Sequence, residues 1–423
     1  MITVIGAGPA GSYAARLLAE QNLDVDIYEE HKEIGNPIQC TGIVTDAFTQ
    51  YTEINKKFYV NTLDTARIYA PDGSTVDFRL KDPNIIIDRH KFDAYLAEKA
   101  AEKGAKVHLQ HRFMGYENGF LKIKDIKANK IKEIKFNNQY ANAPDEFSNE
   151  NSNLAENDAS DKKLNNDLKF RADNINKKIN SLKMSDRLRG KQYKDYLLGA
   201  DGPQSLVAKS FNLYRERKFW FGAQATIKGN FEKNVFEVYL GNICPNLFAW
   251  IVPENESLAR IGLAVHEKSN FYFKELLKKL NIKESQILDY QGGLIPYYDA
   301  KARAENKNVF LLGDAATQVK ATTAGGIIYS MIAAKAAAKA IKEGKSYEKL
   351  WRKELGKDLY LGLKIRNIMN KFSDKDYNYL IKLCKKEKVR RIIERHDREF
   401  PSKFITSLLF AEPRLLYFIK NLF

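Results

Sequence analysis

Three glycines and one acidic residue near the N-terminus have the types and spacing of a dinucleotide-binding site. The run GAGPAG places Gly6, Gly8 and Gly11 directly after the apolar residues Ile2–Ile5. The first glycine permits a tight turn, the second lets the backbone approach a pyrophosphate, and the third allows a helix to pack closely on a strand. Glu29 follows Gly6 by 23 residues, close to the spacing of about 20 expected for an acceptor of a ribose 2′-hydroxyl. The pattern predicts a dinucleotide that carries no 2′-phosphate.

Three later motifs separate a flavin site from a nicotinamide site. LLGDAA, residues 311–316, ends a second apolar run, and GADGPQS, residues 199–205, stands between it and the N-terminal run. Arg89 precedes a helical pattern in IDRHKFDAYL. In this order the motifs resemble those of the para-hydroxybenzoate-hydroxylase-like flavoproteins, in which the aspartate that matches Asp314 binds the ribityl or ribose part of FAD. The resemblance implies FAD as the cofactor.

Three longer segments carry further motifs: residues 29–42 (EEHKEIGNPIQCTG), 248–262 (FAWIVPENESLARIG) and 313–327 (GDAATQVKATTAGGI). They resemble the archaeal geranylgeranyl reductase family, whose members include digeranylgeranylglycerophospholipid reductases. The family's Pro-x-x-Cys element is matched by Pro37 and Cys40, and its aromatic-x-Trp-x-x-Pro…Gly element by Phe248, Trp250, Pro253 and Gly262. The resemblance extends from residue 1 to about residue 344, outside one polar insertion. It implies that FAD reduces the C=C bonds of an isoprenoid lipid.

The resemblance also implies two sets of site residues. Cys40, Phe248 and Trp250 are predicted to line the substrate cavity as the catalytic set, with the Cys40 thiol placed to relay a proton. The cofactor-binding set is Gly6, Gly8, Ala10, Gly11, Glu29, Cys40, Gly42, Arg89, Asp201, Gly313, Asp314, Gly325, Gly326 and Ile327. Structural alternatives stay open, with Cys40 as a small buried apolar residue and the two aromatic residues as sheet core. Lys320 is interpreted either as an anion contact near the cofactor or as a solvated loop lysine.

The elements that must hold these residues follow from hydrophobic periodicity. Ile2–Ile5, residues 12–21 and residues 24–28 predict a strand, a helix and a strand, which open a Rossmann-type βαβ fold. Alternating apolar runs between residues 219 and 264 predict a second, antiparallel sheet. We therefore expect an α/β (α+β) fold, with a Rossmann-type FAD-binding domain, an antiparallel-sheet substrate domain and a helical C-terminal region.

Composition along the chain predicts four parts. Residues 1–136, 190–215 and 305–345 are assigned to the FAD-binding domain, residues 216–304 to the substrate domain, and residues 346–423 to a basic helical region. Asn, Asp, Lys and Ser dominate residues 137–189. Such a segment cannot bury enough apolar surface to offset its ordering entropy, so we expect a disordered insertion.

The positive charge of the chain is concentrated at its C-terminal end. The net charge is +16, and residues 348–423 contribute +9 of it, with 19 Lys and Arg against 10 Asp and Glu. This excess favours an anionic partner, although a solvated helix face would also produce it. Apolar residues beside Lys403, Arg414 and Lys420 are typical of an interfacial helix, or of one packed on the protein's own core. We expect peripheral contact with the inner face of the cell membrane and, without a recognised module, no nucleic-acid binding.

The cysteines and histidines exclude other kinds of site. Cys40, Cys244 and Cys384 give no disulfide framework and indicate a reducing, cytoplasmic setting. A strand predicted from the second residue leaves no room for a signal peptide, and no stretch reaches the roughly 18–20 apolar residues of a membrane span. The six histidines lack metal-ligand spacing, so no metal site is expected.

The electron donor and two other functions stay open on the sequence. No second glycine-rich βαβ unit is found, so the donor must bind transiently, and NADPH, ferredoxin and other donors are not distinguished. An FAD-dependent monooxygenase of an aromatic or polyprenyl substrate would use the same cofactor motifs. A flavoprotein that carries electrons to a quinone is the third reading. Three scattered cysteines exclude a resident cysteine-ligated iron–sulfur cluster, which counts against the carrier.

Overall fold

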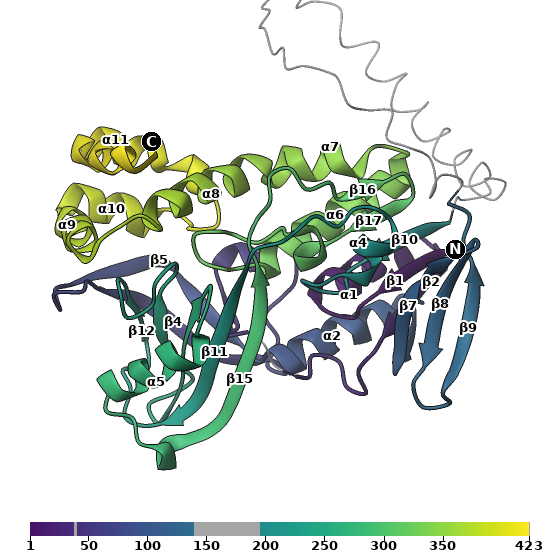
Figure 1. The fold of residues 1–423 in the computed structure, drawn as a ribbon, viewed down its shortest axis with the longest axis horizontal. Helices are drawn as coiled ribbons and strands as arrows, with labels where there is room; N and C mark the ends of the chain where they lie inside the picture. Colours follow the sequence, from purple (N-terminus) through teal and green to yellow (C-terminus); the bar gives the residue numbers. More distant parts are fainter. Residues whose placement is uncertain (38–39, 139–194, 423) are drawn as a thin grey trace, which may run out of the picture.

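Two large sheets dominate the fold of the chain. The computed structural model describes residues 1–37, 40–138 and 195–422. A six-stranded sheet and an eight-stranded sheet lie side by side, with a three-stranded sheet next to the first and a group of C-terminal helices above the second (Figure 1). The predicted fold class is confirmed, because the strands and helices alternate in the first sheet and the second is mainly antiparallel.

Parallel strands form most of the six-stranded sheet, in the order β16-β17-β10-β1-β2-β6. The strands are β1 (Ile2–Ile5), β2 (Val25–Glu29), β6 (Lys106–Leu109), β10 (Tyr196–Gly199), β16 (Glu305–Asn306) and β17 (Val309–Leu311). All residues of β1 and β17 are buried, as expected for parallel strands covered on both faces. Helix α1 (Pro9–Ala19) packs against α2 (Arg89–Glu102) and α6 (Ile327–Glu343), so the predicted βαβ opening is confirmed.

The eight-stranded sheet differs from the sequence prediction in two ways. Its order is β15-β11-β14-β13-β12-β4-β5-β3. The strands are β3 (Ile43–Val44), β4 (Tyr59–Tyr69), β5 (Thr75–Ile87), β11 (Phe219–Lys228), β12 (Val235–Tyr239), β13 (Ala249–Pro253), β14 (Leu258–Val265) and β15 (Ile287–Pro296). Strands β3 to β5 therefore belong to this sheet, although the sequence division placed them with the FAD-binding domain. The pairing of β12 with β4 is parallel, so the sheet is mixed. Alternation along a strand gives its buried face and not its partner, which explains both differences.

A separate meander follows β6. It consists of β7 (His111–Glu117), β8 (Phe120–Asp125) and β9 (Lys130–Lys135), paired in that order. Helix α4 (Leu206–Ser210) packs on β7, and α5 (Ser269–Lys279) packs on β11 and β14. The insertion predicted for residues 137–189 lies outside the described residues from residue 139 onward.

The C-terminal region is helical, as predicted. It contains α7 (Tyr347–Trp351), a π-helical turn η4 (Arg352–Gly356), α8 (Lys357–Met369), α9 (Asp374–Cys384), α10 (Glu387–Arg395), α11 (Ile405–Ala411) and the 3-10 segments η5 (Pro401–Lys403) and η6 (Pro413–Leu422). Ser373 begins α9 with a capping box, in which its side chain accepts the backbone N–H of Asp376. Helix α10 packs on β5, which brings the end of the chain over the second sheet. Within the described ranges, no helix is both long enough and apolar enough to cross a bilayer.

Candidate active site

A cavity of 1440 Å³ lies where the two large sheets and the C-terminal region meet. It is lined by the turn after β1, the loop before α6, one face of the eight-stranded sheet, and residues 393–400 at and after the end of α10. Of the predicted site residues, Gly6, Gly8, Ala10, Glu29, Cys40, Gly42, Arg89, Asp201, Phe248, Trp250, Gly313, Asp314, Gly325, Gly326 and Ile327 all line it. Gly11 does not. The fold thus gathers residues that lie some 300 positions apart in the sequence.

The turn after β1 combines tight backbone packing with open space. Gly6 has a φ of 98°, and a Cβ there would lie 2.3 Å from the carbonyl oxygen of Ala200. A Cβ at Gly11 would lie 2.0 Å from the carbonyl oxygen of Gly6, so Gly11 serves the packing of α1 and not the cavity. A Cβ at Gly8 would meet nothing within 4 Å. The cavity therefore reaches the N-terminus of α1, where backbone N–H groups and the helix dipole favour an anion.

Glu29 ends β2 with its carboxylate turned toward this turn. Its Oε2 accepts the backbone N–H of Ala7 at 2.8 Å, and its Oε1 accepts the backbone N–H of His31 at 2.9 Å. The His31 ring nitrogen Nδ1 lies 2.6 Å from the same Oε1. These contacts fix the carboxylate at the cavity wall. Oε2, which accepts only one of these donors, keeps acceptor capacity for a further one, as a ribose-binding acid requires.

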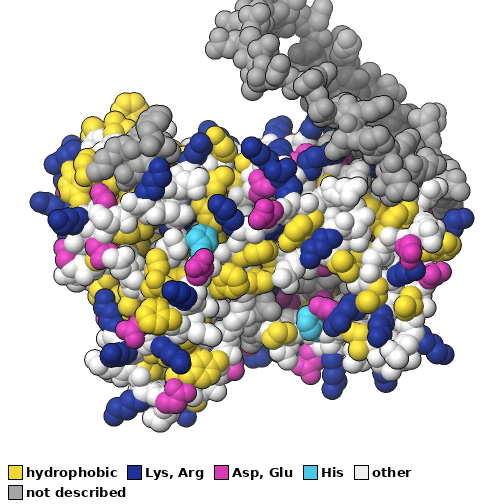
Figure 2. Space-filling view, in the orientation of Figure 1, with side chains coloured by type: hydrophobic (Ala, Val, Ile, Leu, Met, Phe, Trp, Pro, Cys, Tyr) yellow, Lys and Arg dark blue, Asp and Glu magenta, His cyan; other side chains and the backbone are white. Residues whose placement is uncertain are grey.

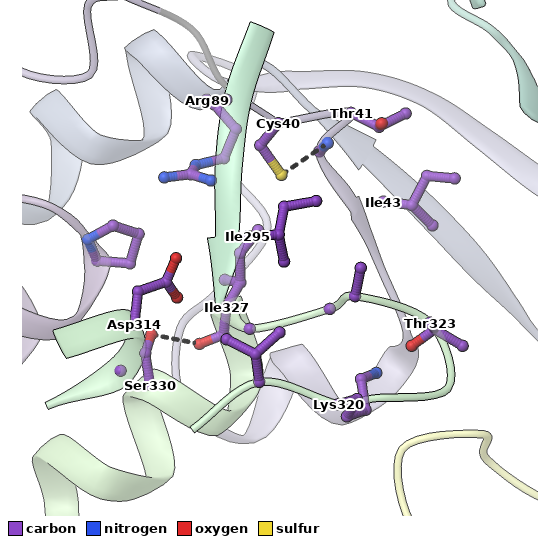
Figure 3. A pocket seen from close by; sticks show the side chains of 18 of the residues that line it. Cys40, Thr41, Ile43, Arg89, Ile295, Asp314, Lys320, Thr323, Ile327 and Ser330 are labelled. Carbon is purple, nitrogen blue, oxygen red and sulfur yellow. Dashed lines mark hydrogen bonds between the residues drawn. The ribbon is translucent and has the colours of Figure 1, made fainter. Parts of the chain in front are cut away.

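Asp314 presents a carboxylate to the cavity from the 3-10 helix η3 (Gly313–Ala316), which follows β17 (Figure 3). Among the described residues, none donates a hydrogen bond to its side-chain oxygens. Burial raises the pKa of Asp314 to about 6, although the positive charges of Arg89 and Arg217 act in the opposite direction. A Cβ at Gly326 would lie 3.2 Å from Asp314 Oδ1, so glycine at the start of α6 leaves room beside the acid. A half-buried carboxylate without a protein donor fits a ligand with hydroxyl groups.

Cys40 and Arg89 lie on the opposite side of the cavity from the α6 loop (Figure 3). The guanidinium of Arg89 donates to both carboxylate oxygens of Asp93, at 2.9 and 2.8 Å. Sγ of Cys40 accepts the backbone N–H of Gly42 at 3.3 Å. Gly42 has a φ of 78°, and a Cβ there would lie 2.2 Å from the carbonyl oxygen of Ile87. Cys40 is therefore half-exposed at the cavity and not the buried apolar residue of the structural alternative.

A polar network on the eight-stranded sheet contacts the aromatic motif. Oε1 of Gln224 accepts from Trp250 Nε1 at 2.9 Å and from Thr41 Oγ1 at 2.7 Å, and Gln224 Nε2 donates to Gln291 Oε1 at 2.6 Å. A Cβ at Gly262 would lie 2.7 Å from Trp250 Cζ2, so this glycine makes room for the indole. The sequence analysis did not identify the two glutamines, because isolated polar residues in alternating strands carry no distinguishing pattern.

Next to this network the sheet presents an apolar wall to the cavity. Strand register places Phe236 beside Ala66, and Ala66 beside Phe78. Val238 likewise pairs with Ile68 on one side and with Trp250 on the other. All these side chains line the cavity, together with Phe248 and Val252. Phe248 and Trp250 thus line the cavity, where the sequence analysis expected them, and their ring centroids lie 6.1 Å apart.

One predicted residue, Asp201, and one residue that the sequence analysis missed, Arg366, form hydrogen bonds within the protein. Asp201 lines the cavity, yet its oxygens accept from Ser205 Oγ at 2.6 Å and from the Val207 backbone N–H at 3.0 Å. Its contact with the cofactor stays a prediction. Arg366, missed in a chain rich in basic residues, is buried and donates to the carbonyl oxygens of Ala321 and Thr322 at 2.9 and 2.8 Å. It positions the loop before α6.

The structure contradicts the interpretation of Lys320 as a solvated loop lysine, whereas its contact with a bound anion stays a prediction, since it lines the cavity. Its side chain is 8% exposed and pairs with Glu399 at 2.5 Å, and its ammonium lies 5.6 Å from the ring centroid of Tyr329. Burial lowers the pKa of Lys320, although Glu399 acts to raise it. The lysine therefore joins the loop before α6 to the C-terminal segment. The partner could not be read from the sequence because it lies 79 positions away.

The described residues fit FAD and give no sign of a metal centre. Gly8 and the N-terminus of α1 would hold the pyrophosphate, while Glu29 and Asp314 would accept from hydroxyl groups at the two ends of the molecule. In residues 1–37, 40–138 and 195–422, no group of three or more His, Cys, Asp or Glu is arranged to hold a metal ion.

Known proteins with similar sequences and folds support the resemblance. Residues 4–43 match the NAD(P)-binding Rossmann-like domain family. A digeranylgeranylglycerophospholipid reductase of Methanosarcina acetivorans is 26% identical over 100% of this chain and 96% of its own. A geranylgeranyl bacteriochlorophyll reductase-like protein of Thermoplasma acidophilum shares the fold with a TM-score of 0.76 and 19% identity, over 100% of this chain and 98% of its own. A p-nitrophenol 4-monooxygenase of Pseudomonas putida shares the fold with a TM-score of 0.60 and 12% identity, over 93% of this chain and 96% of its own.

Proposed function

We propose that this protein is an FAD-dependent reductase of the C=C bonds of geranylgeranyl chains in archaeal-type glycerophospholipids. The observation that carries the proposal is one cavity with two different walls. One wall offers the glycine turn, Glu29 and Asp314, and the other offers an apolar face of the eight-stranded sheet. The full-length similarity to named digeranylgeranylglycerophospholipid reductases supports the same substrate class.

The residues of the chain would bind and orient the two reactants. FAD, when bound and reduced, would supply a hydride for one alkene carbon. Phe248, Val238 and Phe236 would exclude water and hold the isoprenoid chain against the sheet. The Gln224 network would fix the indole of Trp250, since Gln224 is buried and accepts from it at 2.9 Å.

Cys40 is the proposed proton source for the second alkene carbon. Its thiol lies at the cavity between Gly42 and Arg89, where the apolar wall meets the dinucleotide side. A thiol that faces a reacting carbon can donate a proton in the transition state and recover it from solvent. The electrons would come from an external donor, either a reduced nicotinamide such as NADPH or a reduced carrier protein such as ferredoxin.

The C-terminal helices would bring the cavity to a membrane surface. Phe410 on α11 is 83% exposed, and Leu416 and Tyr417 on η6 are 48% and 47% exposed. Figure 2 shows hydrophobic side chains gathered at the end of the molecule that carries α11, with Lys and Arg side chains around them. An exposed apolar patch with a basic rim is typical of interfacial contact. We place the protein in the cytoplasm, peripheral to the inner face of the membrane.

The proposal is tested with purified, FAD-loaded protein reduced by dithionite without oxygen. Addition of a geranylgeranylated glycerophospholipid should reoxidise the flavin, and mass spectrometry should show lipid that has gained pairs of hydrogen atoms. A Cys40→Ser variant should still bind FAD, and dithionite should still reduce the bound flavin, while most turnover of the lipid is lost. A flavin that stays reduced until oxygen is admitted, and then yields a hydroxylated product, would instead identify a monooxygenase. Transfer to a quinone with unchanged lipid would identify an electron carrier.

A further inference from the structure

Three consecutive charged residues, Asp397, Arg398 and Glu399, line the cavity after α10. The two acids are engaged elsewhere. Asp397 Oδ2 accepts from Thr45 Oγ1 at 3.0 Å, and its Oδ1 accepts the backbone N–H of Glu399 at 2.8 Å. The carboxylate of Glu399 pairs with Lys320 at 2.5 Å. Neither acid forms a hydrogen bond or ion pair with the arginine between them, although the charges of both act on it.

Arg398 has no hydrogen bond or ion pair from its side chain to any described residue. Its guanidinium lies over the ring of Phe236, 5.6 Å from the centroid, at the apolar wall of the cavity. Burial lowers the pKa of Arg398, and the neighbouring acids only partly oppose this. A guanidinium carries five N–H donors in a planar fork, and desolvating it without an acceptor is unfavourable. The cavity thus holds a half-buried guanidinium whose N–H donors have no acceptor among the described residues.

Asn84 supplies a second donor without a partner. It is 3% exposed and lines the same cavity, yet its amide nitrogen Nδ2 has no hydrogen-bond partner among the residues that the structure describes. Strand register places Val44 opposite Ile85, the residue after Asn84. Thr45, which follows Val44, holds Asp397. Thr45 therefore links the two donors, since it follows the residue paired with Ile85 and holds the acid next to Arg398.

The apolar wall leads from this place toward the dinucleotide side. Phe236, under Arg398, begins the row that continues through Ala66 and Phe78. Two residues further along β12, Val238 pairs with Trp250, whose indole contacts the Gln224 network near Thr41. An elongated apolar molecule would lie along this face with one end beneath Arg398.

We infer that Arg398, assisted by Asn84, binds the anionic end of an amphiphilic substrate, a phosphate or carboxylate, while the apolar wall holds its chain. The inference rests on the proposed function, the reduction of the isoprenoid chain of the substrate. It adds the residue that would fix the position of this substrate in the cavity. A guanidinium binds such oxyanions with paired, charge-assisted hydrogen bonds. A substrate held at one end would present a restricted set of its double bonds to the reacting centre.

Binding of two matched probes to the FAD-loaded full chain tests the inference without turnover. Geranylgeranyl phosphate and neutral geranylgeraniol are titrated while tryptophan fluorescence is followed, since Trp250 lines the cavity. Arg398→Gln should lower the affinity for geranylgeranyl phosphate by about tenfold or more, as expected for the loss of a charge-assisted pair of hydrogen bonds. The affinity for geranylgeraniol should change by less than about twofold. Asn84→Ala should give a smaller loss of the same selectivity.

Controls separate this site from charge and folding effects. Arg391→Gln removes an exposed arginine of α10 that pairs with Glu387, and it should leave both affinities unchanged. Retained FAD absorbance confirms that each variant is folded. Equal losses for both probes in Arg398→Gln, or no loss for either, would overturn the inference. Inorganic phosphate that binds as tightly as geranylgeranyl phosphate would overturn the assignment to an amphiphile. Wild-type protein that binds the probes selectively but reduces no prenyl lipid would reject only the proposed reaction.

Discussion

The substitution Asp314→Asn tests whether the Asp314 carboxylate binds a ligand or stabilises the folded protein. In the wild-type protein burial raises the pKa of Asp314 from 3.8 to about 6, and no described residue donates a hydrogen bond to its oxygens. The ionised side chain therefore destabilises the protein without cofactor. Asparagine has nearly the same shape and cannot ionise, so the variant removes this cost while leaving the cavity wall in place.

The sign and size of the effect follow from proton linkage. Because the folded-state pKa lies above the unfolded one, the folded protein binds more protons between about pH 4 and pH 6, and its free energy of unfolding falls as pH rises through that window. A shift of about 2 units corresponds to about 3 kcal/mol, and solvent that reaches the side chain reduces this to roughly 1–2 kcal/mol. Cofactor-free Asp314→Asn should be more stable than wild type by that amount near pH 7.

Urea unfolding of cofactor-free protein at about pH 4.5 and about pH 7.5, followed by circular dichroism, measures the difference. The variant should bind FAD about 10- to 100-fold more weakly, since a hydrogen bond to a charged group is lost. Glu98→Gln, which removes an exposed carboxylate paired with Lys57, is the control and should change neither quantity. Equal pH dependence in wild type and Asp314→Asn, with equal FAD affinity, would refute the reasoning.

Three other substitutions test separate parts of the site. Gly8→Val places a side chain where a Cβ meets nothing within 4 Å, so the melting temperature should hold while FAD affinity falls by more than about tenfold; a variant that still binds FAD would contradict this. Lys320→Met strands Glu399 in the interior and should cost about 3–5 kcal/mol in urea unfolding, whereas Lys320→Met combined with Glu399→Met should recover most of it. Trp250→Phe removes the donor to Gln224 and should cost about 1 kcal/mol of stability with a larger loss of turnover; unchanged turnover would argue against a role at the cavity.

The dinucleotide half of the site was predictable because its determinants are local. Gly6, Gly8 and Glu29 act through backbone geometry within one βαβ unit, and their spacing is a direct consequence of strand and helix lengths. The Gly-Asp pair after β17 is likewise defined by its own turn. Short-range rules placed these residues at the cavity without knowledge of any distant contact, and their contact with a cofactor stays a prediction.

The substrate half was not predictable in the same way. The sequences of strands β3 to β5 would show the same alternation in either sheet, because alternation gives the buried face of a strand and does not identify its partner strand. Gln224 carries a recognisable role only once Thr41, Trp250 and Gln291 surround it. The place of residues 393–400 at the cavity depends on α10 packing on β5, which no local pattern in a basic, helical segment expresses.

This difference indicates where the specificity of the enzyme resides. The glycine turn, Glu29 and Asp314 form the proposed dinucleotide side, so substitutions on the apolar wall can change the substrate without disturbing the cofactor. Lys320 and Glu399 join the loop before α6, which faces the cofactor side, to the segment that carries Arg398. The same ion pair engages the carboxylate next to Arg398, so the N–H donors of the guanidinium remain available for an anionic ligand. A buried ion pair is a weak source of stability. The position of the Lys320–Glu399 pair is better explained by the orientation that it gives to Arg398.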